Sequence, residues 1–272
     1  MEAKELEFLE NKAKEIRRKT IEMIGFLGVG HIGGAMSVTD ILTVLYYKYM
    51  DIDPQKPKKP DRDKLVLSKG HAGPALYSIL ADKGFFPEEW LHMLNRCGTP
   101  LPSHCDMNRT PGIDMTTGSL GQGMSAAIGL ALAGRLDGLD KNVYLVLGDG
   151  ECDEGQVWEG AMAAAQFRLG SLVAFVDFNG LQLDGTINDI MGLEDMSAKW
   201  SAFGWHVQRV DGHSMQALSE AIENARSETS RPSVIVADTI KGKGAFFAEG
   251  RLDSHNMKYD YETALAACEK LQ

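Results

Sequence analysis

The sequence predicts one α/β domain over residues 1–272, with a parallel sheet and helices on both of its faces. The main observation is that short apolar runs alternate with helical patterns in the second half of the chain, as in parallel strands joined by crossover helices. A second observation is that 44% of the residues are hydrophobic, which is enough for a sizeable core. No repeat, low-complexity tract or linker divides the chain, so we expect a single domain.

The first half of the chain is expected to be mainly helical. Apolar residues among Lys, Arg and Glu over 4–25 predict an exposed amphipathic helix. A Ser/Thr/Asp cluster opens a mostly buried helix over 37–49. Prolines and lysines over 51–63 are typical of a surface loop. A short apolar run at 64–67 then leads into Ser68-Lys69-Gly70-His71 and a further apolar helix.

The second half is expected to contain the regular alternation. Residues 98–123 include five glycines and three prolines, which predicts a long ordered loop of the kind that usually has a function. A helix of small residues follows over 125–134. Strands are then expected over 143–147, 172–178, 205–210 and 234–237. Helices are expected over 154–169, 215–225 and 261–271.

The charge balance argues against two classes of partner. Asp and Glu number 38 against 28 Lys and Arg, and the net charge of −10 disfavours nucleic acid or an anionic membrane surface. No apolar run reaches the roughly 18 residues of a membrane span, and no signal-peptide core follows the charged first residues. We therefore expect a cytoplasmic protein. The four cysteines include no Cys-x-x-Cys pair and are expected to be reduced thiols.

Two loops at predicted strand ends indicate a metal and phosphate site. Gly148-Asp149-Gly150 follows the strand at 143–147, and Asn179 follows the next strand, 31 positions after Gly148. Carboxylate and amide oxygens are ligands for Mg²⁺, which commonly bridges a protein to phosphate oxygens. Either loop alone would be interpreted as a glycine-rich turn, but the pair predicts a diphosphate site. A Rossmann dinucleotide site is rejected, because Asp153 stands where that motif needs its third glycine.

With further motifs, these loops resemble the thiamine diphosphate enzymes, and the transketolase family in particular. The resemblance runs from about Thr20 to His255, nearly the whole chain. The other motifs are Gly30-His31-Ile32-Gly33-Gly34, Ser68-Lys69-Gly70-His71, Leu101-Pro102-Ser103-His104 and Thr116-Thr117-Gly118-Ser119-Leu120-Gly121-Gln122-Gly123. Six motifs in the family's order make the resemblance specific. It implies the thiamine diphosphate-binding fold, here in the form of the family's diphosphate-binding domain.

The resemblance implies which residues hold the metal and the diphosphate. Asp149, the Asn179 side chain and the backbone carbonyl of Leu181 match the family's magnesium ligands. Gly150 matches a backbone contact to the diphosphate. His71 matches a histidine that lies near the diphosphate.

Other matches concern the thiamine and the neighbouring chain. Gly118-Ser119-Leu120 matches the loop that lines the thiamine. Glu154 matches a glutamate at the contact between the cofactor sites of paired chains, although an acid that stabilises its helix start is an equal alternative. Lys69 and Lys241 are possible phosphate contacts, but solvated lysines are the more common outcome.

Three histidines match the family's substrate contacts. His31, His104 and His255 correspond to the histidines around the substrate's hydroxyls and carbonyl, and His31 and His255 are the best candidates for proton transfer. Two neighbours depart from the family's usual pattern. Cys105 and Asn256 stand where the family usually has proline and glycine, which affects the expected acceptor side of the site.

The implied function is that of one subunit of a split transketolase, which transfers a two-carbon ketol group from a ketose phosphate to an aldose, as in the pentose phosphate pathway. The implied cofactors are thiamine diphosphate and Mg²⁺. The pyrimidine-binding and C-terminal domains of the family, with the glutamate that activates the cofactor, are expected on a partner chain, in a heterotetramer with two copies of each chain. The isolated chain is therefore expected to be inactive.

Three alternatives remain. The first is a transketolase-like subunit for an unusual sugar. The second is the alpha subunit of a 2-oxo acid dehydrogenase, which the histidine set disfavours because that reaction has no sugar hydroxyls to bind. The third is a non-catalytic scaffold, which the presence of both Asp149 and Asn179 disfavours.

Overall fold

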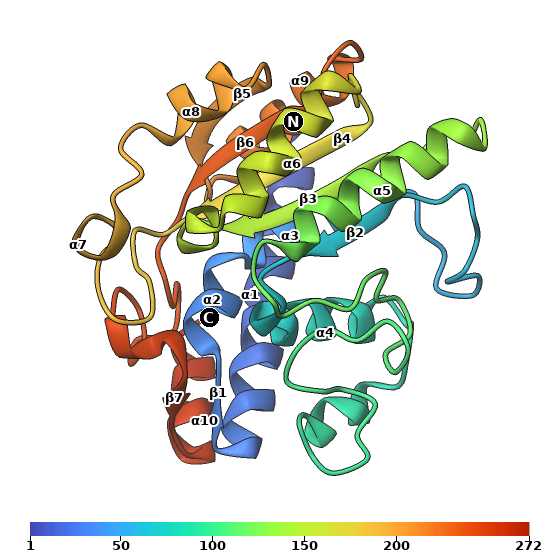
Figure 1. Cartoon of the computed structure of the whole chain (residues 1–272). Coiled ribbons are helices and arrows are strands. Elements are labelled where there is room, and N and C mark those ends of the chain that lie inside the picture. Colours follow the sequence, from blue (N-terminus) through green and yellow to red (C-terminus); the bar gives the residue numbers. More distant parts are fainter. Residues whose placement is uncertain (272) are drawn as a thin grey trace.

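A five-stranded parallel sheet, in the order β2-β3-β4-β6-β5, crosses the centre of the molecule (Figure 1). The computed structural model describes residues 1–271. The strands are β2 (Lys64–Leu67), β3 (Val143–Gly148), β4 (Leu172–Phe178), β5 (His206–Asp211) and β6 (Ser233–Asp238). Most of their residues are apolar, because a parallel sheet with helices on both faces buries both faces. The predicted fold class is confirmed.

Alternate side chains of each strand enter two separate cores, because successive residues point to opposite faces of the sheet. In β3, Tyr144 and Val146 belong to one core, whereas Leu145 and Leu147 belong to the other. The helices of the first core include α1 (Ala3–Leu27), α2 (Ile32–Ser37), α3 (Thr39–Val44), α4 (Gly73–Asp82), α9 (Met215–Ser227) and α10 (Tyr261–Lys270). The helices of the second core are α5 (Gln122–Leu136), α6 (Gly155–Gln166) and α8 (Met196–Ala202).

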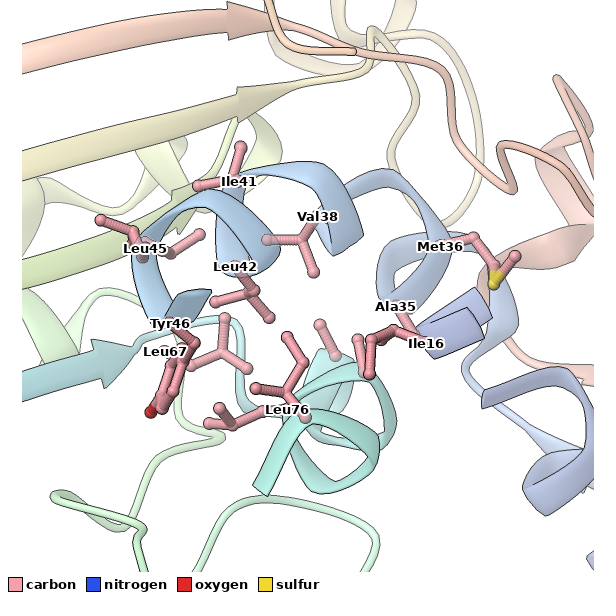
Figure 2. Packing of buried hydrophobic residues seen from close by; sticks show 14 of the residues in the cluster. Ile16, Ala35, Met36, Val38, Ile41, Leu42, Leu45, Tyr46, Leu67 and Leu76 are labelled. Carbon is pink, nitrogen blue, oxygen red and sulfur yellow. The ribbon is translucent and has the colours of Figure 1, made fainter. Parts of the chain in front are cut away.

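The predicted helix over 37–49 begins at the last residue of α2 and consists of α3 followed by a π-helical turn at Leu45–Tyr49. Hydroxyl groups bond back into this segment: Thr39 Oγ1 donates to the Ala35 carbonyl, and Thr43 Oγ1 donates to the Thr39 carbonyl. Such side-chain bonds compete with the backbone and bend helices, which accounts for the break between α2 and α3. Figure 2 shows the apolar side chains of this segment grouped with Leu76 of α4.

Two features were missed in the sequence. A small antiparallel pair joins β1 (Val29–Gly30) to β7 (Met257–Lys258), and two-residue strands have no periodicity to detect. Helices α7 (Ile187–Met191) and α8 were also missed, although Thr186 and Asp195 cap them with side-chain acceptors. Along residues 1–271, none of the helices is both long and apolar enough to span a membrane.

Candidate active site

The residues that follow β2, β3 and β4 meet at the carboxyl edge of the sheet, where ligands bind in open α/β folds. They line a cavity of about 190 Å³. Its wall is formed by Gly34, Lys69, His71, Leu120, Gly148, Asp149, Gly150, Glu151, Asn179, Leu181, Gln182, Leu183, Lys241 and His255. Five of the six sequence motifs therefore contribute residues to one cavity.

A larger cavity of about 570 Å³ lies between residues 57–64 and 107–114. Its Arg62 side chain is paired with Asp114, and Lys64 Nζ lies 3.5 Å from the same carboxylate. None of the motif residues lines it. We therefore place the candidate active site at the smaller cavity, because the larger one lacks the catalytic and metal-binding residues that the sequence predicts.

Asp149 is the centre of the predicted metal site. It is 3% exposed, and its carboxylate accepts hydrogen bonds from Gly150 N at 2.8 Å and from Gly180 N at 2.6 Å. Burial, followed by the nearby charge of Asp177, raises the pKa of Asp149 to about 6. A bound cation would offset both effects.

The two other predicted ligands line the same cavity. Asn179 Oδ1 accepts a hydrogen bond from Leu181 N at 3.2 Å, and Lys241 Nζ lies 3.4 Å from the Leu181 carbonyl oxygen. One carboxylate, one amide and one carbonyl are hard oxygen donors that fit Mg²⁺ and leave positions for phosphate oxygens. Among residues 1–271 no three Asp, Glu, His or Cys side chains cluster as a metal site, so an ion here would need those additional oxygens.

Lys69 and Lys241 are buried, which corrects the expectation of solvated lysines. Lys69 Nζ pairs with Asp177, a fully buried carboxylate of β4 that also accepts hydrogen bonds from Ser37 Oγ and Thr239 Oγ1. This carboxylate compensates the buried charge of Lys69. Within the described residues Lys241 has only carbonyl acceptors, and burial lowers its pKa to about 8. The cavity is therefore suited to an anion.

Four histidines, three of them from the sequence motifs, lie together beside this cavity. The ring centroid of His31 is 5.3 Å from that of His71, 5.4 Å from that of His104 and 5.5 Å from that of His255. Burial is the main effect on all four, and it lowers the pKa of His31 and of His255 to about 4. These imidazoles are therefore neutral at pH 7 and able to accept a proton.

The remaining predicted residues surround the histidines and the cavity. Leu120 lines the cavity, and a side chain at Gly118, where φ is +144°, would lie 3.0 Å from the His104 ring. Ser119 lies between them and its carbonyl accepts a bond from Gln122 N. Glu154 is exposed at the N-cap of α6 but makes no capping hydrogen bond with its side chain, so its carboxylate is available to groups outside the helix.

A third cavity, of about 90 Å³ and smaller than the other two, adjoins His31. Asn95, Ser103 and Asn256 line it, and within residues 1–271 none of their side chains forms a hydrogen bond. Cys105 does not line it, because its side chain is buried in the first core. Of the two departures from the family's pattern, only Asn256 therefore faces this part of the site.

Sequence reasoning missed two residues of the site. Glu151 and Asp177 are buried carboxylates that accept hydrogen bonds from several segments. An acid within the apolar run at 172–178 was the available signal for Asp177. Glu151 is one of four acids in a short stretch, and nothing in the sequence distinguishes it from its exposed neighbour Glu154.

Comparison with known proteins identifies the family. The model of the family described as "Transketolase, thiamine diphosphate binding domain" matches residues 9–269. The chain therefore belongs to the transketolase N-terminal, thiamine diphosphate-binding domain family.

Particular relatives agree with this assignment. The chain is 56% identical to the 6-deoxy-6-sulfo-D-fructose transketolase subunit of Clostridium sp. (strain MSTE9), over 97% of this chain and 96% of that protein. It is 38% identical to an apulose-4-phosphate transketolase subunit from Phocaeicola vulgatus, over 93% of this chain and 89% of that protein. The crystal structure of Campylobacter jejuni transketolase superimposes with a TM-score of 0.91 and 29% identity, over 97% of this chain but only 43% of that chain.

Proposed function

We propose that the chain is the diphosphate-binding subunit of a split transketolase, which transfers a two-carbon ketol group from a ketose to an aldose together with a partner subunit. The observation that carries this proposal is the position of four histidines directly beside a cavity that contains Asp149 and Asn179. The family assignment and the two relatives described as subunits, which the chain covers almost fully, support it.

Thiamine diphosphate, when bound, supplies the carbanion-stabilising centre that ketol transfer needs. On this chain, Asp149, Asn179 and the Leu181 carbonyl would hold Mg²⁺, and Gly150 and His71 would contact the diphosphate. Lys241 supplies a buried positive charge for the same group. Gly118-Ser119-Leu120 would line the thiamine, and Glu154 would meet the neighbouring copy.

The histidines provide the proton chemistry. Because the pKa values of His31 and His255 are about 4, both rings are neutral at pH 7 and accept a proton from a sugar hydroxyl. The same low pKa favours rapid return of that proton to the product. His104, whose ring packs next to His31, would contact a substrate hydroxyl.

The donor substrate we propose is a ketose other than the common ketose phosphates. The first donor to test is 6-deoxy-6-sulfo-D-fructose. The 56% identical relative is named for this sugar, and the other relative described above is also named for an unusual one. The 2-oxo acid alternative loses support, because the matching family is transketolase. A pentose phosphate donor remains the comparison in the assay.

The experiment is reconstitution. This chain and a partner that carries a pyrimidine-binding domain are mixed with thiamine diphosphate, Mg²⁺ and an aldose acceptor, and 6-deoxy-6-sulfo-D-fructose, fructose 6-phosphate and xylulose 5-phosphate are compared as donors. We expect transfer only with both chains, a preference for the sulfosugar, and loss of activity in Asp149→Ala. Full activity of the isolated chain would overturn the split-enzyme proposal, and a preference for xylulose 5-phosphate would overturn the donor.

A further inference from the structure

The buried carboxylate of Glu151 connects three separate segments of the chain. It lies on the turn Gly150–Asp153 after β3 and is 3% exposed. Its Oε1 accepts hydrogen bonds from Ser68 Oγ and from Gly121 N, the latter at 2.9 Å. Its Oε2 accepts a hydrogen bond from Gly148 N at 2.9 Å. Both oxygens are thus occupied by protein donors.

Each of the three donors adjoins a different part of the candidate cofactor site. Ser68 immediately precedes Lys69 and lies three residues before His71. Gly121 ends the Gly118-Ser119-Leu120 loop, and Gly148 immediately precedes Asp149. The donors are far apart in sequence, so only the folded chain brings them to one carboxylate.

We propose that Glu151 is a positioning residue, which holds the three cofactor-facing loops in their binding arrangement before the cofactor arrives. This inference rests on the proposed cofactor site. Glu151 acts through the backbone of its neighbours. Its hydrogen bond from Gly148 N fixes the turn on which Asp149 lies. A site arranged in advance binds its ligand without the cost of ordering these loops.

Steric contacts leave these loops little freedom to rearrange around a changed side chain. A Cβ at Gly123, in the first turn of α5, would lie 2.3 Å from Ser68 Oγ, so the serine is packed directly against that helix. Gly121 has φ of +81°, a conformation that favours glycine, and a Cβ there would lie 2.9 Å from Glu154 Cβ. The hydrogen-bond geometry is therefore defined by packing as well as by the carboxylate.

The isosteric amide tests the acceptor role of Glu151. In Glu151→Gln, the side-chain NH₂ group must face either Gly148 N–H or Gly121 N–H, and an amide group cannot accept a hydrogen bond through its nitrogen. In either orientation one backbone N–H loses its acceptor: the buried N–H of Gly121 or the part-buried N–H of Gly148. The size and shape of the side chain are unchanged, so the variant removes the interaction without opening a cavity.

The matched control is Asp63→Asn. Asp63 is 4% exposed, and its carboxylate accepts hydrogen bonds from Asp51 N at 3.0 Å and Asn142 N at 2.7 Å, at the amino ends of β2 and β3 away from the candidate site. This variant also leaves a backbone N–H of a part-buried hydrogen bond without an acceptor. It reports the general cost of such a loss, without a change in the cofactor loops.

Two measurements are made on each variant. The first is hydrogen exchange of peptides that contain residues 121 and 148 in the cofactor-free chain. The second is calorimetric affinity for thiamine diphosphate with Mg²⁺, in the complex with the partner. We expect Glu151→Gln to speed exchange at one or both glycines and to weaken cofactor affinity about tenfold, with turnover recovering at saturating cofactor. Asp63→Asn should change neither reading.

The possible outcomes separate this inference from the proposed function. Unchanged exchange and affinity in Glu151→Gln, or equal losses in both variants, would overturn the positioning role. If the wild-type complex binds no thiamine diphosphate, the proposed function fails, whereas the exchange data still report on Glu151. Should Glu151→Gln not fold, Ser68→Ala removes one of the three donors, and cofactor affinity equal to wild type in that variant would also overturn the inference.

Discussion

His255 links the two cavities of the site. Its ring lies 5.0 Å from that of His71 and lines the cavity that contains Asp149, while Asn256 next to it lines the smaller cavity beside His31. With the cofactor in the first of these cavities and the substrate in the second, as we propose, His255 would transfer protons between the two. Its neutral state at pH 7 follows from burial and from the nearby charge of Lys241.

We expect His255→Ala to lower turnover by about 10²-fold or more, the usual contribution of a general acid or base, with little change in thiamine diphosphate affinity. Turnover and cofactor affinity of the reconstituted complex are measured on the same preparation. A variant that kept its turnover and lost only cofactor affinity would place His255 in diphosphate binding instead.

Asn256 is expected to contribute to acceptor recognition. Because its amide has no hydrogen-bond partner within the described part of the chain and faces the cavity beside His31, it is available to a sugar hydroxyl. Asn256→Gly should raise the KM for the acceptor about two- to tenfold, the value of one net hydrogen bond, and leave the KM for the donor unchanged. Steady-state kinetics with a series of aldoses is the measurement, and equal changes for donor and acceptor would contradict this assignment.

The histidine cluster also makes stability depend on pH. The pKa of His31 in the folded chain is about 4, below its ordinary value of 6.5, so the unfolded chain binds more protons between these pH values. The stabilising effect of a neutral His31 is complete above pH 6.5 and is lost as the pH falls toward 4. Since the ring is partly exposed, the effect at pH 5 is about 1 kcal/mol. Between pH 7 and pH 5, the free energy of unfolding should therefore fall by about 1 kcal/mol less in His31→Asn than in the wild-type chain. Urea unfolding at the two pH values is the measurement.

At the scale of elements, α5 and α6 pack closely at Gly160. A Cβ at Gly160 would lie 2.4 Å from Met124 Cγ, so the two helices approach at a contact that only glycine allows. Gly160→Ala should therefore destabilise the chain by about 1–3 kcal/mol through overpacking. Gly129→Ala, in α5 with nothing within 4 Å of the added carbon, should instead stabilise by about 0.5–1 kcal/mol. Equal effects in thermal unfolding would contradict the packing described here.

Sequence patterns identify some of these elements better than others. The strands of the sheet follow from apolar runs, and Asp149 and Asn179 follow from their position at strand ends. The pairing of Val29 with Lys258 does not, because a two-residue strand has no period and its partner is far away in the chain. Glu151 was missed for a similar reason: its importance lies in donors from residues 68, 121 and 148, and no local pattern connects them.

At the scale of the molecule, we expect an assembly with two copies of this chain and two of its partner. Apolar side chains such as Met162 and Phe167 on and beside α6 are about half exposed, as in surfaces that a partner covers. Sedimentation of the mixed chains should show one species with the mass of two copies of each. A stable one-to-one complex with full activity would rule out this stoichiometry.

The β1–β7 pair has a consequence for the order in which the site is made on the ribosome. His31 directly follows β1, and His255 lies two residues before β7. The pairing of Val29 with Lys258 therefore brings together two histidines that are far apart in the sequence. The Asp149 loop and its neighbouring strands emerge from the ribosome long before residue 258. A nascent chain can thus bring the proposed metal ligands together first, and His31 meets His255 only after residue 258 has been synthesised.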